Sequence, residues 1–137
     1  MDAVIQSFLT GFPVLMLHSS VTLAMLAVAV FIYIKITPYN EIALIRGGNT
    51  AAAVSLAGAI LGLGIPLAFS MASSISIWEI LIWGPVTLFL QLIAYRITSL
   101  LLKDLPRRII DGEIGPALVL VSIKLAVAAI NAAAVTA

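Results

Sequence analysis

Residues 51–72 read AAAVSLAGAILGLGIPLAFSMA, a run of apolar and small residues without a charged side chain. About 20 such residues in a helix cross about 30 Å of hydrocarbon, so this stretch can span a bilayer. Three further stretches have similar length and composition: Val14 to Ile34, Ile80 to Leu102 and Ile114 to Val135. Lipid offers no partner for an open backbone amide, which leaves helices as the spanning form at these lengths. The sequence therefore predicts an all-α membrane protein with four transmembrane helices and almost no strand.

The composition leaves little chain outside these four stretches. Of the 137 residues, 63% are hydrophobic and only 9% are charged. The remaining connections are too short for a soluble domain of ordinary size, so residues 1–137 are expected to form one integral membrane domain in contact with lipid. The chain has no Cys and one His, which argues against disulfides and a conventional metal site, and no cofactor is expected. The net charge of +1 gives no reason to expect a nucleic-acid partner.

The charged residues at the ends of the spans predict the orientation. No Lys or Arg precedes the first span, which argues against the alternative of a cleaved signal peptide. Basic residues concentrate in the first and third connections, whereas the opposite surface carries acids. The basic residues are Lys35, Arg46, Lys103, Arg107 and Arg108, and the acids are Asp2 and Glu79. The sequence therefore predicts a multi-pass membrane protein whose first and third connections face the cytoplasm and whose termini lie on the outer face.

The two halves of the chain resemble each other in their pattern. A shift of 64 positions places Gly48 on Gly112 and aligns the first span with the third and the second with the fourth. Residues 14–73 and 78–137 are then two tandem two-helix repeats with the same orientation. The shift also places Gly58 on Ser122 and Gly62 on Ala126. Small residues at this spacing let helices approach closely, so we expect the second and fourth spans to pair along these stripes.

Both basic connections read as a short surface helix that ends at glycine. In the first, Thr37 can cap a helix that Pro38 begins, and Gly47 and Gly48 end it. Such stretches are usually interfacial turns, although a surface for a partner or a lipid headgroup is the alternative.

Four polar residues lie at this end of the bundle: Glu41, Arg46, Asn49 and Glu113. Asn49 and Glu113 stand where the second and fourth spans begin, and helix capping is their expected role. A site for a cation or an amine, built from both, is the alternative.

Lys124 lies near the middle of the fourth span, where a lysine costs about 3 kcal/mol on insertion scales. It is expected to face protein or water. Gln91 lies near the same depth, Asn131 follows two turns along the same face, and the spans contain no acid. We expect a hydrogen-bonded cluster of Lys124, Gln91 and Asn131, whose charge is balanced by another chain, by water or by loss of the proton. The alternative is a network that only sets the packing of the helices.

The remaining polar and aromatic residues have simpler interpretations. His18 shares a face with Thr22 near the outer surface, and a structural role is favoured over a proton sensor. The aromatic residues near the span ends, Tyr33, Tyr39, Trp78 and Trp83, fit an aromatic belt at the membrane surfaces.

Residues 35–67, KITPYNEIALIRGGNTAAAVSLAGAILGLGIPL, resemble the signature of the YjfL-type small inner-membrane proteins, the domain of unknown function numbered 350. The shared features are a threonine-proline pair, an acid at Glu41, an Asn before small residues at Asn49 to Ala53, and a proline-leucine pair at Pro66. Asn131 to Ala133 match an Asn-Ala-Ala near the family's C-terminus. The resemblance implies a bacterial inner-membrane protein of four spans and no established activity. The family pattern usually has a small residue at the position of Lys124.

Three classes of function follow from these patterns. A non-enzymatic component that forms homo-oligomers and acts with other envelope proteins, in membrane maintenance or a stress response, is the main hypothesis. A small ion channel or carrier with Lys124, Gln91 and Asn131 along its path is the second. An intramembrane enzyme is the weakest, because no paired nucleophile and base and no phosphate-binding loop appear at a recognisable spacing.

Overall fold

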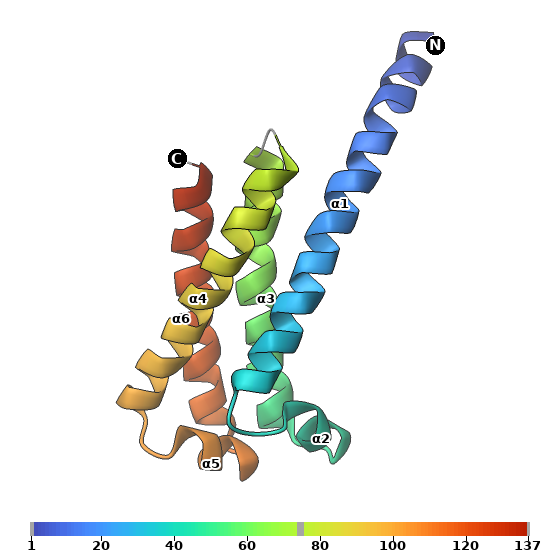
Figure 1. Ribbon diagram of the computed structural model, residues 1–137. Coiled ribbons are helices and arrows are strands. Elements are labelled where there is room, and N and C mark those ends of the chain that lie inside the picture. Colours follow the sequence, from blue (N-terminus) through green and yellow to red (C-terminus); the bar gives the residue numbers. More distant parts are fainter. Residues whose placement is uncertain (1, 74–75, 137) are drawn as a thin grey trace.

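A computed structural model describes residues 2–73 and 76–136 (Figure 1). Its elements, in chain order, are α1 (Asp2–Ile36), α2 (Glu41–Arg46), α3 (Thr50–Ser73), α4 (Ile77–Leu101), α5 (Leu105–Ile110) and α6 (Ile114–Thr136). The four long helices are apolar enough to cross a membrane, and the described residues contain no strand. The predicted all-α, four-span class is confirmed.

The long helices run alternately up and down (Figure 1). The start of α1 and the end of α6 therefore lie at the same end of the bundle. The short helices α2 and α5 lie across the opposite end, which we call the α2/α5 end. Each joins two long helices through a few residues, in agreement with the short surface helices expected from the sequence.

The first helix is longer than the apolar run suggested. It begins at Asp2 instead of near Val14 and continues through Pro13. Its first part extends beyond the other helices (Figure 1), and residues 2–17 are all exposed. A proline interrupts one hydrogen bond within a helix, and the missing bond is tolerated here because the surrounding turns continue on both sides.

Helix α3 is the centre of the bundle. Ten of its residues are buried, compared with two described in α1. Its most extensive contact is with α6, and it also packs against α1 and α4. Ala59 and Leu63 pack in one apolar cluster with Tyr33 of α1. Small side chains on α3 explain this position, because they allow neighbouring helices to approach from several directions.

The two glycines of the α3 stripe contact different helices. A Cβ added at Gly58 would lie 2.7 Å from Val121 Cγ2 and 3.2 Å from Val121 Cα, so Gly58 gives α6 its close approach. At Gly62 the same atom would meet the amide group of Gln91 on α4 at 2.6 Å. The stripe therefore packs α3 against two neighbours within one chain.

The stripe expected on α6 lies elsewhere. Ser122 and Ala126 are exposed, and Ser122 Oγ donates a hydrogen bond to the carbonyl of Leu118 in its own helix. The buried face of α6 carries Pro116, Ala117, Leu120, Lys124, Ala128, Asn131 and Ala132. The buried positions of α3 and α6 coincide when one helix is shifted by 65 positions along the chain, which places Ala52 on Ala117. The sequence pattern indicated a shift of 64. One residue turns a helix by about 100°, which is enough to move Ser122 and Ala126 off the packed face.

The connection before α3 begins and ends its short helix with local hydrogen bonds. Asn40, and not Thr37, caps α2: its Oδ1 accepts from the amide of Ala43 at 3.2 Å. Thr37 instead donates its hydroxyl hydrogen to the carbonyl of Tyr33. Gly48 and Gly112 follow the two short helices with φ of 90° and 84°, the left-handed conformation that glycine adopts without strain.

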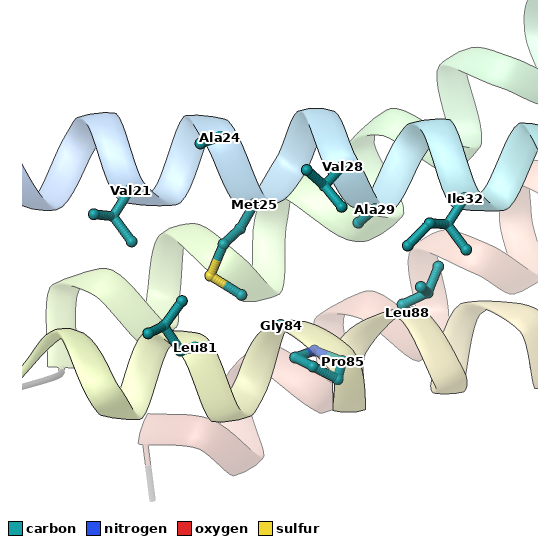
Figure 2. A pocket seen from close by; sticks show the side chains of 10 residues that line it. All are labelled: Val21, Ala24, Met25, Val28, Ala29, Ile32, Leu81, Gly84, Pro85 and Leu88. Carbon is teal, nitrogen blue, oxygen red and sulfur yellow. The ribbon is translucent and has the colours of Figure 1, made fainter.

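A groove of about 400 Å³ separates α1 from α4 (Figure 2). Its lining is apolar, from Val21, Met25, Val28 and Ile32 on one side to Leu81, Gly84, Pro85 and Leu88 on the other. Met25 reaches across it toward Gly84.

Replacing Gly58 with Ala tests the close contact between α3 and α6. The new methyl group would overlap Val121, and forcing the helices apart is expected to lower stability by about 1–3 kcal/mol. The thermal unfolding temperature in detergent measures the loss. Gly64→Ala is the matched control, since its new Cβ would lie 3.7 Å from Leu26 Cδ2, an ordinary contact. Equal unfolding temperatures for the two variants would contradict the assigned contact.

Candidate functional site

Lys124 points into the bundle, not toward lipid. Its residue is fully buried near the middle of α6. Side chains on a helix tilt toward its N-terminus, so the amine is directed toward the α2/α5 end. Lys124 Nζ lies 3.5 Å from the carbonyl oxygen of Ser55 and 4.4 Å from the ring centroid of Tyr33. Tyr95 of α4 presents a second ring, with its centroid 5.9 Å away.

The acid that faces Lys124 comes from a connection between spans. Glu41 is the first residue of α2 and is fully buried, and the charge of Lys124 acts on its carboxyl group. Neither carboxylate oxygen has a hydrogen-bond partner among the described residues. The sequence predicts a surface helix around Glu41 and contains no acid within the spans for Lys124. The structure instead buries Glu41 at the start of α2, so an acid from a connection lies within electrostatic range of Lys124.

Two of the tyrosines expected in an aromatic belt are buried beside these charges. Tyr33 is completely buried, and Tyr39 is 5% exposed. The hydroxyl of Tyr39 lies 3.1 Å from Ser55 Oγ, in hydrogen-bonding contact. Trp78, in contrast, is 74% exposed, as expected for a residue of the belt. Together, Tyr33, Tyr39, Glu41, Ser55, Tyr95 and Lys124 form what we call the buried polar cluster.

The charged groups of this cluster are buried away from water, which changes their protonation. Burial raises the pKa of the Glu41 carboxyl group, and the positive charge of Lys124 opposes part of that rise. The phenol rings of Tyr33, Tyr39 and Tyr95 lie within electrostatic range of the same carboxyl group. The hydroxyls of Tyr33 and Tyr95 make no hydrogen bond of ordinary geometry with the described residues, although Thr37 lies near Tyr33 and Tyr39 near Tyr95. The hydrogen-bonding capacity of several polar atoms in the cluster is therefore only partly used by the described residues.

Gln91 and Asn131 do not join the side chain of Lys124. Gln91 Nε2 donates to the backbone carbonyl of Lys124 at 3.1 Å, and its Oε1 has no partner among the described residues. Asn131 lies farther along α6, where its Nδ2 donates to Thr87 Oγ1 at 3.3 Å. All three expected residues line the inner faces of α4 and α6, but they form separate contacts instead of one cluster.

Asn49 joins two elements at the α2/α5 end. Its Oδ1 accepts from the amide of Ala52 at 2.9 Å and so caps α3. Its Nδ2 donates to the carbonyls of Ile109 and Ile110 at 2.9 and 3.0 Å. These carbonyls lie at the end of α5, where a helix leaves them without an internal partner. Asn49 therefore caps one helix at its start and another at its end.

The other polar residues expected at this end lie at the surface. Glu113 is an exposed partner of Arg108, with 3.3 Å between Oε1 and Nη2, and makes no site with Asn49. Arg46 is exposed. His18 is half-buried, and its carbonyl accepts the hydroxyl of Thr22 at 2.7 Å. In the described part of the chain, no group of three or more His, Cys, Asp or Glu could hold a metal ion.

Sequence reasoning missed Glu41, Tyr33 and Tyr95 as partners of Lys124. One signal pointed to them: an isolated lysine within a span needs a counter-charge, and the nearest acids in the chain lie in the connections. The sequence does not show which acid turns inward, because both connections at this end contain acids: Glu41 in the first and Asp104, Asp111 and Glu113 in the third.

Removing the charges of Lys124 and Glu41 singly and together tests their interaction. Lys124→Met and Glu41→Gln should each lower the stability in detergent, because each leaves the other group buried without an opposite charge. The loss of stability in the double variant should be smaller than the sum of the two single losses by about 1–3 kcal/mol. The exposed pair is the control: Arg108→Gln and Glu113→Gln should show a coupling below about 1 kcal/mol. Additive losses for the buried pair would contradict the interaction.

Replacing Asn49 with Ala removes three hydrogen bonds at once. The unfolding temperature should fall, since a lost cap alone costs about 1 kcal/mol, and amide exchange over residues 105–112 should accelerate. Asn40→Ala removes one exposed cap of the same kind and is the control. Unchanged exchange in α5 would show that Asn49 does not hold it.

Comparisons with known proteins agree on one family. Residues 7–135 match the family model described as Domain of Unknown Function (DUF350). The UPF0719 inner membrane protein YjfL of Escherichia coli strain K12 is 35% identical over 113 residues, which cover 82% of this chain and 86% of that protein. The YjfL of Escherichia coli O157:H7 matches to the same extent. No solved structure matches. With four helices able to span a membrane and an inner-membrane relative over most of its length, the chain belongs to the DUF350 family of multi-pass inner-membrane proteins.

Proposed function

We propose that this protein is a non-enzymatic component of the inner membrane that works as a homo-oligomer, joined through the outer part of α1. The observation that supports the proposal is the exposed, apolar first half of this helix. The membrane location comes from the family, whereas the oligomer and the absence of catalysis belong to the proposal.

The length of α1 gives the first argument. Its 35 residues measure about 52 Å along the axis, compared with about 30 Å of hydrocarbon. Even a tilt of about 40°, at the upper end of the usual range, leaves about 40 Å along the membrane normal. Part of the apolar helix therefore extends past the hydrocarbon. Apolar side chains there gain more from a protein partner than from water and headgroups.

The spacing of the exposed side chains gives the second argument. Ile5, Phe8, Phe12 and Leu15 follow one another at intervals of three, four and three residues and are 42–61% exposed. This is the spacing of a seam between two helices. A second copy of the chain carries the same four residues, so a dimer with twofold symmetry would bury the seams of both copies against each other. The stacked rings of Phe8 and Phe12, with centroids 5.1 Å apart, give the seam a broad apolar centre.

The orientation and the internal duplication are also part of the proposal. The α2/α5 end carries Arg46, Lys103, Arg107 and Arg108, which favours its placement at the cytoplasmic side. The proposed oligomeric contact then lies on the outer side, with the start of α1. A duplicated two-helix unit is supported by the two six-residue surface helices and by the matching positive φ angles after them.

The alternative of a channel or carrier along Lys124, Gln91 and Asn131 has less support. Gln91 and Asn131 each bond to a neighbour within the packed bundle, and all three residues are at most 6% exposed. A continuous path would require these contacts to open.

Cysteine cross-linking tests the proposed contact directly, because the chain has no Cys of its own. In membranes under mild oxidation, Phe8→Cys should yield a disulfide-linked dimer in good yield. Ile130→Cys is the matched control: it lies in the last two turns of α6, the helix whose end lies with the start of α1, and is 72% exposed. Similar yields at the two positions, or a monomeric mass for the parent protein in mild detergent, would refute the proposed assembly.

A further inference from the structure

The buried polar cluster contains an acid, a base and two phenols whose polar atoms are not paired with one another. Glu41 Oε1 and Oε2 accept no hydrogen bond from the described residues. The hydroxyls of Tyr33 and Tyr95 make no hydrogen bond of ordinary geometry there, although Thr37 lies near the first and Tyr39 near the second. The one hydrogen bond described for the Lys124 amine, to the carbonyl of Ser55, is long at 3.5 Å. Leaving such groups unpaired in a dry interior is costly, and buried water commonly occupies polar sites of this kind.

The charges of the cluster make a proton the ligand that fits best. A metal or organic cation would be repelled by the ammonium of Lys124, and an anion by the carboxylate of Glu41. No hydrogen bond or ion pair joins Lys124 to Glu41 among the described residues, so a proton moves from Lys124 Nζ to a Glu41 oxygen through intervening water, with one N–H bond broken and one O–H bond formed. The pair then changes from ammonium and carboxylate to amine and carboxylic acid. Its net charge stays zero, which avoids the cost of a single uncompensated charge in the core.

The cluster has a route to water at the α2/α5 end. A pocket of about 390 Å³ opens there between the end of α1, α4 and α5, lined by Ile36, Pro38, Leu92, Tyr95, Arg96, Ser99 and Pro106. Tyr95 belongs to both the pocket and the cluster. Toward the other end, Ala59 and Leu63 belong to the closed apolar cluster of the core, and both are fully buried. The pocket therefore gives access from one side.

We propose that Glu41 and Lys124 form a proton-exchange site inside the bundle, which water reaches from the α2/α5 end through the pocket beside Tyr95 and Arg96. The site belongs to a single chain and does not depend on the proposed association through α1.

The charged and phenolic groups within electrostatic range of Glu41 come from several elements. They are Tyr33 on α1, Tyr39 in the following turn, Tyr95 on α4 and Lys124 on α6, and the charge of Arg96 acts in turn on Tyr95. Ser55 of α3 joins the cluster through the hydroxyl of Tyr39, and Leu105 and Ile109 of α5 pack with Tyr39 in an apolar cluster. Burial raises the pKa of Glu41, which favours a proton on this carboxyl group at a higher pH than usual.

Infrared spectroscopy of the protein in lipid nanodiscs tests the site. The carbonyl stretch of a protonated carboxylic acid should persist above the ordinary range for glutamate and then disappear as the pH rises. Glu41→Gln should abolish this signal, and Lys124→Met should move its disappearance to higher pH by about one unit or more, because the ammonium no longer favours the carboxylate. Glu113→Gln, which removes an exposed acid at the same end, should leave the signal unchanged. A signal that survives in Glu41→Gln, or a wild-type protein without it, would overturn the proposal.

The route is tested by the rate at which this signal shifts after transfer to D₂O. Ser99→Trp fills the pocket and should slow the shift several-fold, whereas Leu100→Trp, at a position that is 80% exposed, should not. Equal rates would refute access through the pocket. Should Lys124→Met fail to fold, Glu41→Gln and Ser99→Trp still decide the two parts of the proposal.

Discussion

The structure depends on one constraint: an amine in the middle of a membrane helix must find its partners inside the protein. Hydrocarbon offers Lys124 neither water nor hydrogen bonds, so the amine is surrounded by Tyr33, Ser55, Tyr95 and the charge of Glu41. These groups belong to α1, α3, α4 and α2. A single residue of α6 thus contacts a group on every other long helix and acts electrostatically on the first residue of α2.

The two surface helices are held by different interactions. Helix α2 begins at the buried Glu41 and packs against α3, whereas α5 is held by the hydrogen bonds of Asn49 to its last carbonyls. Both connections lead to α3 and α6, the pair in closest contact. Polar contacts therefore concentrate at the α2/α5 end. At the opposite end α1 leaves the bundle and presents mainly apolar side chains, so the two ends are suited to different tasks.

Membership of the DUF350 family locates the protein in the inner membrane without assigning an activity. The proposed association surface and the proposed proton site are at opposite ends and rest on separate observations. One is an exposed apolar seam, and the other is a set of buried polar atoms. An assembly joined on one side of the membrane, with a protonation site accessible from the other, would be consistent with both, and each can fail without the other.

The sequence by itself determined the solvent, the class and the number of spans, because apolar length and the absence of charge are properties of each segment alone. It also identified Lys124 as unusual and Asn49 as a cap, since both follow from position along a helix. Tertiary structure decided the rest. Whether Glu41 or Glu113 turns inward, and whether Tyr33 lies in a belt or in the core, depends on how the connections fold back. The face of α6 that is buried differs by about 100°, the rotation of one residue along a helix, from the face that the sequence repeat indicated. Helix packing sets this rotation, and a repeat in the sequence does not.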